Sequence, residues 1–352
     1  MKKNIGIVVE DYFDVPHETE QINAAILKKE IIDLGRNAKI FYFYGKSSDE
    51  EVFKFSEFFK SKIDDVYLSG KISGKNFVKL LFFCFLKRSK LHFRIPSYNL
   101  KMFKRYKVLF SLLIKIGLLK LYSYDGVHKK FIEDELGFEA KVLEPLVNLA
   151  PLNKKTGSKK EFDILFIGSY NDLKRGLLEL IDAVKIIKKK YKKISLKIIS
   201  RYGVYTGQKD WFAGYRGKRL DILKTIKEAI KNNGLEKNII FSGKVDDVGR
   251  EYDLARVYVL PVREYDKMPA IPFTILESLY HGTPVVSTNY FGVGLVVEKK
   301  FLVNQNLDDK KFVESLAKKI TLALDKPSKV SLDKKFYSRE ATKKFLKYVE
   351  EK

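Results

Sequence analysis

Apolar and polar residues alternate along the chain in blocks that predict strands and helices in turn. Residues 4–10 (NIGIVVE) form a short run rich in β-branched residues, which favours a strand. An amphipathic stretch follows as far as Leu34 and Gly35, where a glycine suits a helix end, and residues 38–44 (AKIFYFY) again favour a strand. This order is typical of a parallel sheet covered by helices.

The same alternation continues on both sides of a polar segment. Before it we predict a strand at 118–124, a helix at 126–137 and a short strand at 140–146. Residues 148–161 (NLAPLNKKTGSKKE) are polar and basic and have the composition of a linker. After it we predict strands at 162–168, 195–200, 238–243, 257–262 and 284–288, with helices at about 174–190, about 220–232 and around Glu277.

A chain of 352 residues fits about two domains. The repeated alternation indicates two consecutive doubly wound α/β domains, residues 1–150 and 151–325, followed by a terminal segment, 326–352. Ligands of such sheets bind beyond the carboxyl ends of the strands, so we expect the site in the cleft between the two domains.

Cysteine content and hydropathy limit the cellular location that we expect for the protein. Cys84 is the single cysteine, so the chain forms no internal disulfide and has no cysteine cluster for zinc. No run reaches the roughly 18 apolar residues that a membrane span needs, and we interpret the basic N-terminus as the start of a strand, not as a signal peptide. We expect a reducing, cytoplasmic location.

The chain is strongly basic, with 68 Lys and Arg against 44 Asp and Glu. A charge of +24 predicts an anionic partner, which can be a nucleic acid, an acidic bilayer or a phosphate-bearing substrate. The lysines are spread over both halves, and the sequence has no helix-turn-helix, RNP-like or zinc pattern. We therefore expect no nucleic-acid partner.

Residues 100–120 predict one basic amphipathic helix. Its polar face carries Lys101, Lys104, Lys107, Ser111 and Lys115, and its apolar face carries Leu109, Leu112, Leu113 and Ile116. One interpretation packs the apolar face on the sheet and leaves the lysines in water. The other docks this helix, with the nearby FFCFLKRSK, on an anionic membrane, which would make the protein peripheral at the inner face of the cell membrane.

Two sites carry candidate chemistry. Lys174 and Arg175 stand beside Gly176 near a predicted helix start, where free N–H groups and cations favour a diphosphate, although two solvated bases are the plainer interpretation. No G-x-G-x-x-G or P-loop pattern is present. Glu277 lies early in an otherwise apolar helix, where it serves either as a partner of the helix dipole or as an acceptor for a vicinal diol such as a ribose.

These residues resemble a known family. The segment PFTILESLYHGTPVVST, the upstream GSYNDLKRGLLELIDAV, the strands NIIFSGKV and EYDLARVYVLPV, and the final FYSREATKKFLKYVEE resemble the retaining glycosyltransferases of family 4. The resemblance covers about residues 160–350 and implies a GT-B fold, with two Rossmann-like domains and a C-terminal helix that returns toward the first.

The resemblance also implies roles on the donor side. Glu277 would hold the donor ribose, Lys174 and Arg175 would act in catalysis on the leaving diphosphate, and the backbone at Phe273 and Thr274 would approach the phosphates. Gly168 and Ser169 would border them, with Ser169 standing where the family has arginine. Pro269 stands where members usually carry a second glutamate, and we hypothesise that Glu264 or Asp266 replaces it.

On the acceptor side the family's glycine-rich loop is replaced by EDYFDVPHETEQ, in which Asp14 and His17 are candidates, with His128 as a further one. The resemblance implies transfer of a sugar, with retention and without a metal or cofactor, from a UDP- or GDP-sugar to a glycan or lipid-linked acceptor. The other interpretation is a non-catalytic protein that binds a nucleotide sugar or glycan, which Pro269 favours.

Overall fold

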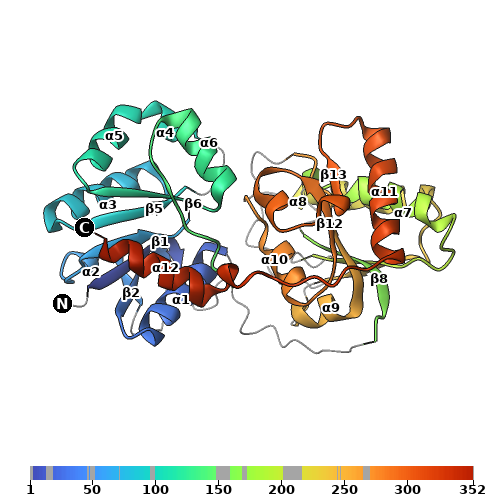
Figure 1. Cartoon of the computed structure of the whole chain (residues 1–352), viewed down its shortest axis with the longest axis horizontal. Coiled ribbons are helices and arrows are strands. Elements are labelled where there is room, and N and C mark those ends of the chain that lie inside the picture. The colour runs from blue at the N-terminus through green and yellow to red at the C-terminus, as the bar shows by residue number, and fades with distance from the viewer. Residues whose placement is uncertain are drawn as a thin grey trace. The chain divides into compact units, whose positions relative to one another are not determined.

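The structure is a computed structural model of the chain (Figure 1). It describes residues 3–12, 19–45, 47, 52–70, 72–95, 100–147, 159–168, 173–200, 216–243, 245, 247–264 and 270–351. The chain divides into two compact units, one made of Met1–Asn148 with Asp333–Lys352 and the other of Leu149–Leu332.

The first unit is built on a seven-stranded sheet in which every described pair of neighbouring strands is parallel. The order across the sheet is β3-β2-β1-β4-β5-β6-β7. The strands are β1 Asn4–Tyr12, β2 Asn37–Gly45, β3 Val52–Lys54, β4 Asp65–Leu68, β5 Lys90–Arg94, β6 Leu119–Ser123 and β7 Lys141–Val142. The helices are α1 Thr19–Asp33, α2 Phe55–Phe58, α3 Gly74–Lys87, α4 Lys101–Arg105, α5 Lys107–Lys115, α6 Gly126–Leu136 and α12 Ser338–Glu350.

Helices cover both faces of this sheet. The chain steps from β1 to β2 in one direction and from β4 to β7 in the other, so right-handed crossovers place α1 on one face and α3, α5 and α6 on the opposite face. Side chains of β1 alternate between the two cores: Ile5, Ile7 and Val9 pack with α1, and Val8 packs with α3. Figure 1 shows this layering around β1 and β5.

The last helix completes the first unit, although it is far along the chain from the strands that it covers, β4, β5 and β6. Phe345 of α12 packs edge-on against Tyr67 and His92, with ring centroids 5.1 and 5.4 Å apart respectively. Ala341 and Val349 are buried in the same core as α1, and Figure 1 shows α12 beside α1. The sheet face on this side therefore needs the C-terminal end of the chain.

One prediction for this unit was wrong in part. The single helix expected over residues 100–120 is two helices, α4 and α5, that are separated at Tyr106. All five polar-face residues are exposed as expected, but of the four apolar-face residues only Leu113 is buried, and Leu109, Leu112 and Ile116 face water. The contact with the sheet is made by Phe110 and Leu113.

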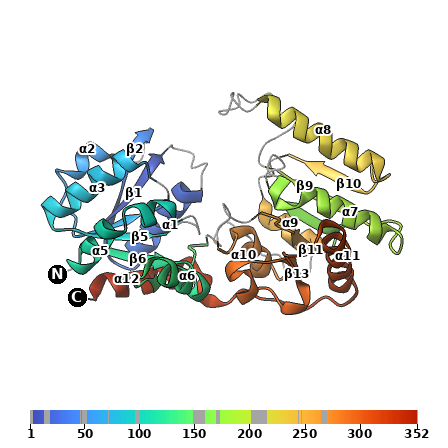
Figure 2. The same ribbon diagram turned by 90° about the horizontal axis from the view of Figure 1, so that it is seen from above.

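The second unit has a six-stranded parallel sheet in the order β10-β9-β8-β11-β12-β13. Figure 2 shows β10, β9, β11 and β13 following one another across it. The strands are β8 Phe162–Ile167, β9 Leu196–Ile199, β10 Ile239–Ser242, β11 Ala255–Leu260, β12 Val285–Asn289 and β13 Leu302–Asn304. The helices are η1 Leu173–Arg175, α7 Leu177–Lys188, α8 Arg216–Asn232, α9 Val248–Leu254, α10 Phe273–Tyr280, η3 Phe291–Leu295, η4 Lys299–Phe301 and α11 Asp309–Asp325, and η5 Lys334–Phe336 belongs to the first unit.

Strand β8 lies at the centre of this sheet, and the chain runs outward from it in both directions, as in a doubly wound sheet. The carboxyl ends of β8 and β11, which are hydrogen-bonded neighbours, therefore meet at one edge of the sheet. In the part of the chain that the structure describes, no helix is both long and apolar enough to span a bilayer.

Candidate active site

The candidate site of the second unit starts where β8 ends. Gly168 follows the strand directly, and the chain re-enters the described structure at η1, which carries Lys174 and Arg175. A Cβ on Gly168 would lie only 3.3 Å from Cδ of Arg175, so the arginine side chain passes directly beside this glycine. The structure thus brings together two residues that the sequence analysis placed at the same site.

The turn that carries the two cations is fixed against the loop after β11. The backbone N–H of Arg263 donates to the carbonyl of Lys174 at 2.7 Å. Gly176 has φ +78°, and a Cβ there would lie 1.9 Å from the carbonyl oxygen of Pro261, a contact that no side chain tolerates. Glycine at 176 is therefore required for the two loops to meet.

Lys174 also forms an ion pair with Glu264, the residue after Arg263. Both side chains are partly exposed, so the pair contributes little to folding stability. Its consequence is local, because it keeps a carboxylate and an ammonium group together at the edge of the sheet where Gly168 and Arg175 lie.

Helix α10 presents one side at this site. Phe273, Thr274 and Glu277 are half-buried, whereas the residues between and after them, Ile275, Leu276, Ser278 and Leu279, are buried against the sheet. Positions 273, 274 and 277 are spaced by three and four residues and so share one side of the helix. The first backbone N–H groups of the helix, at this same end, have no acceptor within the helix.

Buried tyrosines hold this side of α10 in place. The hydroxyl of Tyr252 donates to Oε2 of Glu277 at 3.0 Å, and the hydroxyl of Tyr258 donates to Oγ1 of Thr274 at 2.8 Å. Burial, and then the charge of Glu277, raise the pKa of Tyr252 well above its ordinary value, so the phenol stays a donor. Burial likewise raises the pKa of Tyr258, and the positive charge of Arg175 partly opposes this rise.

The position of Glu277 bears on its two interpretations. It is the fifth residue of α10, and the first turn of the helix carries no acidic residue. The favourable effect of the helix dipole on a carboxylate falls off within the first turn. The helix dipole therefore does not account for the position of Glu277, whose half-buried carboxylate is held by the buried hydroxyl of Tyr252.

Of the remaining candidate residues, His128 is the one that the structure describes. His128 lies in the first turn of α6 in the other unit, is completely buried, and its Nδ1 accepts from the backbone N–H of Tyr124 at 3.3 Å. Asp14, His17, Ser169 and Asp266 lie outside the described residues.

Sequence reasoning missed the two tyrosines, and it noted Gly176 only as the neighbour of the two cations. Tyr252 of α9 and Tyr258 of β11 stand in the run EYDLARVYVLP, where core packing alone explains their aromatic rings. The tertiary contacts, Tyr252 with Glu277 and Gly176 with Pro261, are what reveal them. Within the described chain, no group of three or more His, Cys, Asp or Glu side chains is arranged to hold a metal.

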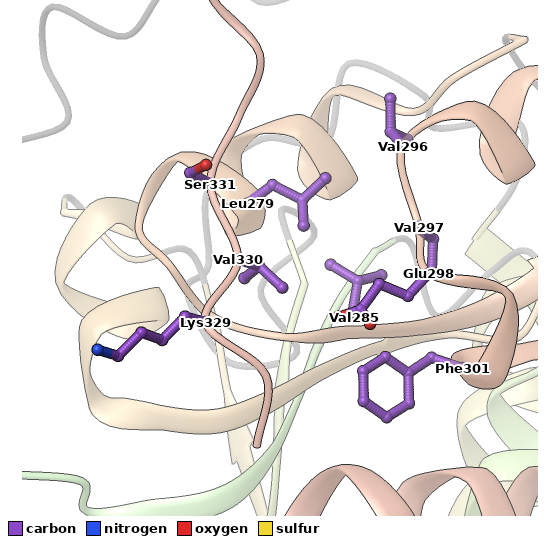
Figure 3. A pocket seen from close by; sticks show the side chains of 9 residues that line it. All are labelled: Leu279, Val285, Val296, Val297, Glu298, Phe301, Lys329, Val330 and Ser331. Atoms are coloured by element: carbon purple, nitrogen blue, oxygen red, sulfur yellow. The ribbon is translucent and has the colours of Figure 1, made fainter. Parts of the chain in front are cut away.

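A separate hollow of about 270 Å³, with both polar and apolar lining, lies at the opposite edge of the same sheet. It is lined by Leu279 at the end of α10, Val285 at the start of β12, and Phe301, and Figure 3 shows the Lys329 side chain pointing away from it. It lies at the amino end of β12, its polar lining residues are Glu298, Lys329 and Ser331, and it includes none of Phe273, Thr274 and Glu277, so it is no part of the candidate site.

The fold and this site define a class of protein. Two units built on parallel sheets with helices on both faces, and a last helix that packs in the first unit, constitute the GT-B fold. The chain belongs to the family of glycosyl transferases group 1, whose family model matches residues 151–343, more than half of the chain. The general activity is therefore transfer of a glycosyl group.

Solved structures share this fold at low sequence identity. A glycosyltransferase from Rickettsia africae ESF-5 is 14% identical with a TM-score of 0.72, over 99% of this chain and 98% of that one. Anabaena Alr3699/HepE in complex with UDP is 14% identical with a TM-score of 0.68, over 98% and 95%. WaaG, a glycosyltransferase involved in lipopolysaccharide biosynthesis, is 11% identical with a TM-score of 0.58, over 99% and 95%. The search of curated proteins found no match.

Proposed function

We propose that this protein is a retaining glycosyltransferase of family 4 that moves a sugar from a nucleotide sugar to a glycan or lipid-linked acceptor. The observation that carries the proposal is the side of α10 on which Glu277, oriented by Tyr252, lies with Phe273 and Thr274. A carboxylate there accepts two hydrogen bonds from the vicinal hydroxyls of a ribose, and the helix N-terminus offers N–H groups to the diphosphate.

The leaving group determines the roles of the cations. A departing nucleoside diphosphate gains negative charge in the transition state, and fixed cations and N–H donors lower the barrier. Arg175, beside Gly168, and Lys174 supply that charge, so we propose that no metal is required. For transfer with retention, the leaving phosphate oxygen takes the proton of the acceptor hydroxyl on the same face of the sugar.

The donor is a UDP- or GDP-sugar in this proposal, and the Anabaena relative in complex with UDP supports the first. Glu264, on the loop after β11, replaces the missing second glutamate at the donor sugar, with Asp266 as the other candidate. In the apo protein Glu264 pairs with Lys174, so donor binding would separate this pair and release both groups to the substrate.

The acceptor is a glycan or a lipid-linked glycan, and the relative involved in lipopolysaccharide biosynthesis supports this class. We propose that Asp14 and His17 contact it, and that His128 orients the loop at Tyr124 from its buried position. The protein would work at the inner face of the cell membrane.

Calorimetric titration tests the donor site. The protein is titrated with UDP, GDP and ADP and with their sugars, beside Glu277→Ala and the control Glu314→Ala, which changes an exposed glutamate on α11. We expect one diphosphate to bind, and Glu277→Ala to weaken it by at least about tenfold, because hydrogen bonds to a charged group are lost. Unchanged affinity in Glu277→Ala contradicts the ribose role, and absence of binding contradicts the nucleotide-sugar donor.

The same samples distinguish a transferase from a non-catalytic protein that only binds a nucleotide sugar. A protein that only binds a nucleotide sugar would bind the diphosphate and lose it in Glu277→Ala, yet release no nucleotide from the donor sugar over time. Slow release of the diphosphate by the unaltered protein, abolished in Glu277→Ala, is the result expected of a transferase.

A further inference from the structure

The first unit exposes large apolar side chains on two neighbouring helices. On α3, four of them face water, with Phe85 64% exposed, and on α5 Val108 is 85% exposed. Such residues are buried in most α/β proteins, and contiguous exposed apolar surface marks a site of interaction. We name this surface the α3–α5 patch, and its apolar members are Val78, Phe82, Phe85, Leu86, Val108, Leu109, Leu112 and Ile116.

The two helices lie side by side on one face of the sheet. They follow consecutive strands of the same sheet by crossovers of the same hand, and the rings of Phe77 on α3 and Phe110 on α5 stack at 5.8 Å. Both views of the chain place α3 between α2 and α5 (Figures 1 and 2).

The apolar side of α5 is turned toward α3. Lys107 marks the opposite side, because its ammonium lies 3.8 Å from the position a Cβ would take on Gly137, at the end of α6. At about 100° per residue, Leu109, Leu112 and Ile116 lie roughly 140–200° around the helix from Lys107. The exposed apolar residues of both helices therefore belong to one surface.

The patch continues into a groove beside α2. A cavity of about 500 Å³ is lined by Phe55 and Phe59 of this region together with Lys79 and Phe82 of α3. Lys54 lies at the same groove, so an apolar recess is bordered by two ammonium groups. This combination suits a molecule with an apolar body and an anionic head.

Every charged side chain on α3, α4 and α5 is basic. Between Asp65 and Asp125 the sequence has no acidic residue. Exposed cations flank the apolar side chains on both helices and on α4, and they are Lys75, Lys79, Lys87, Arg88, Lys101, Lys104, Arg105, Lys107 and Lys115. Of these, Lys104 pairs with Glu135 of α6.

We propose that the α3–α5 patch docks the protein on an anionic lipid bilayer, with the apolar side chains entering the interface and the lysines meeting the headgroups. Each cation near an anionic membrane strengthens binding by about fivefold, and apolar side chains add to it. A second copy of the chain would bring two like-charged surfaces together through the same patch, which disfavours it as the occupant. Six of the eight apolar members of the patch are Val, Leu or Ile, which have no aromatic face for a base to stack on, and Phe82 and Phe85 are its two aromatic members.

This inference deepens the proposed function, since it locates the surface by which a lipid-linked acceptor would be approached. Its test needs neither donor nor acceptor, so the two proposals fail separately. Vesicles of phosphatidylcholine, alone or mixed with phosphatidylglycerol, are floated with the full chain at low and at high salt.

Matched variants distinguish the effect of the patch from the effects of net charge and of exposed apolar residues elsewhere on the protein. Phe82→Ser with Phe85→Ser, and Leu112→Ser with Ile116→Ser, are compared with Ile240→Ser, a similarly exposed apolar residue on β10. Lys79→Glu with Lys115→Glu is compared with Lys310→Glu and Lys318→Glu on α11, which changes the net charge equally. Circular dichroism verifies that each variant folds.

We expect flotation with the anionic vesicles that falls at high salt, a loss of at least about tenfold in each patch variant, and no loss in either control. Absence of flotation by the unaltered protein, or an equal loss in the controls, overturns the proposal. So does a dimer that dissociates in Leu112→Ser with Ile116→Ser when no vesicle binds, or binding of single-stranded RNA that only the patch variants lose.

Discussion

At the scale of single residues, the orientation of Glu277 depends on a hydroxyl that is 25 positions away in the sequence. Tyr252 is fully buried and its hydroxyl donates to the Glu277 carboxylate. One oxygen of that carboxylate is thereby directed before a ligand arrives, which reduces the entropy lost on binding. We propose that Tyr252 positions Glu277, because its ring lies in the core and its hydroxyl donates to the carboxylate.

Tyr252→Phe tests this positioning role. Loss of one hydrogen bond to a charged group should weaken binding of the nucleoside diphosphate by about fivefold, about 1 kcal/mol, and less than Glu277→Ala does. Titration calorimetry measures the affinity, and the double variant gives the coupling. If Tyr252→Phe weakens binding to the same extent in the Glu277→Ala background, the tyrosine acts independently of Glu277 and the positioning role is wrong.

At the scale of elements, the position of the cations is set by the close approach of two loops. The turn of η1 meets the loop after β11 through the Arg263 N–H and through Gly176, which contacts Pro261. Because Gly176 is also the N-cap of α7, the turn that carries the two cations leads directly into that helix. The helix predicted over residues 174–190 runs through this junction in the sequence pattern, which gives no sign of the break at Gly176.

Gly176→Ala should destabilise the second unit strongly. A Cβ at 1.9 Å from a backbone oxygen forces the loops apart, and the positive φ adds strain, so we expect a loss of about 3 kcal/mol or more in the free energy of unfolding. Gly234→Ala is the control, since it has φ +61° but open space around it, and should cost only about 1 kcal/mol. Urea denaturation measures both, and equal losses would mean that φ strain alone is responsible.

At the scale of elements, helix α5 also shows what an amphipathic sequence pattern does not predict. The sequence of α5 identifies an apolar side correctly, but a pattern does not say what covers that side. Phe110 and Leu113 are enough to attach the helix to the sheet, and this leaves Leu109, Leu112 and Ile116 exposed.

At the scale of the whole molecule, a buried polar chain joins the strands of the first unit. Lys3 pairs with Asp65 at 3.0 Å, Nε2 of His92 donates to Asp65 at 2.7 Å, and Nδ1 of His92 accepts from the Tyr122 hydroxyl at 2.7 Å. Asp65, His92 and Tyr122 lie on β4, β5 and β6, Lys3 directly precedes β1, and Phe345 of α12 packs against the rings of His92 and Tyr122. Burial lowers the pKa of His92, so the imidazole is neutral near neutral pH, and both of its ring nitrogens take part in hydrogen bonds.

This network predicts a dependence of stability on pH. The pKa of His92 is lowered in the folded state, so the unfolded state binds the proton more tightly, and stability should fall as pH drops below about 6.5. The slope should approach about 1.4 kcal/mol per pH unit once unfolded His92 is protonated and folded His92 is not.

Urea denaturation followed by circular dichroism, at about pH 7.5 and about pH 5.5, gives the difference between the two free energies of unfolding. His92→Asn, which keeps a donor for Asp65 but does not titrate, should show a smaller difference. An identical difference in both proteins would show that the dependence comes from other groups.

The sequence by itself determined what depends on neighbouring residues. The alternation of strands and helices, the polar segment after residue 148 and the motif around Glu277 are local, and they were sufficient for two parallel α/β domains and for the GT-B resemblance that the fold confirms. The glycosyltransferase assignment also comes from the sequence, since the family model matches residues 151–343, which include the motif around Glu277.

Only the tertiary structure decided which distant residues meet. Three contacts join separate elements: Tyr252 with Glu277, Gly176 with Pro261 and Phe345 with Tyr67. Hydrophobic periodicity shows which face of an element is apolar, but it does not show which element packs against that face. The exposure of Leu109, Leu112 and Ile116 has the same physical reason. Which residues of a helix are buried depends on the space that the neighbouring elements leave, and on α5 Phe110 and Leu113 already fill that space.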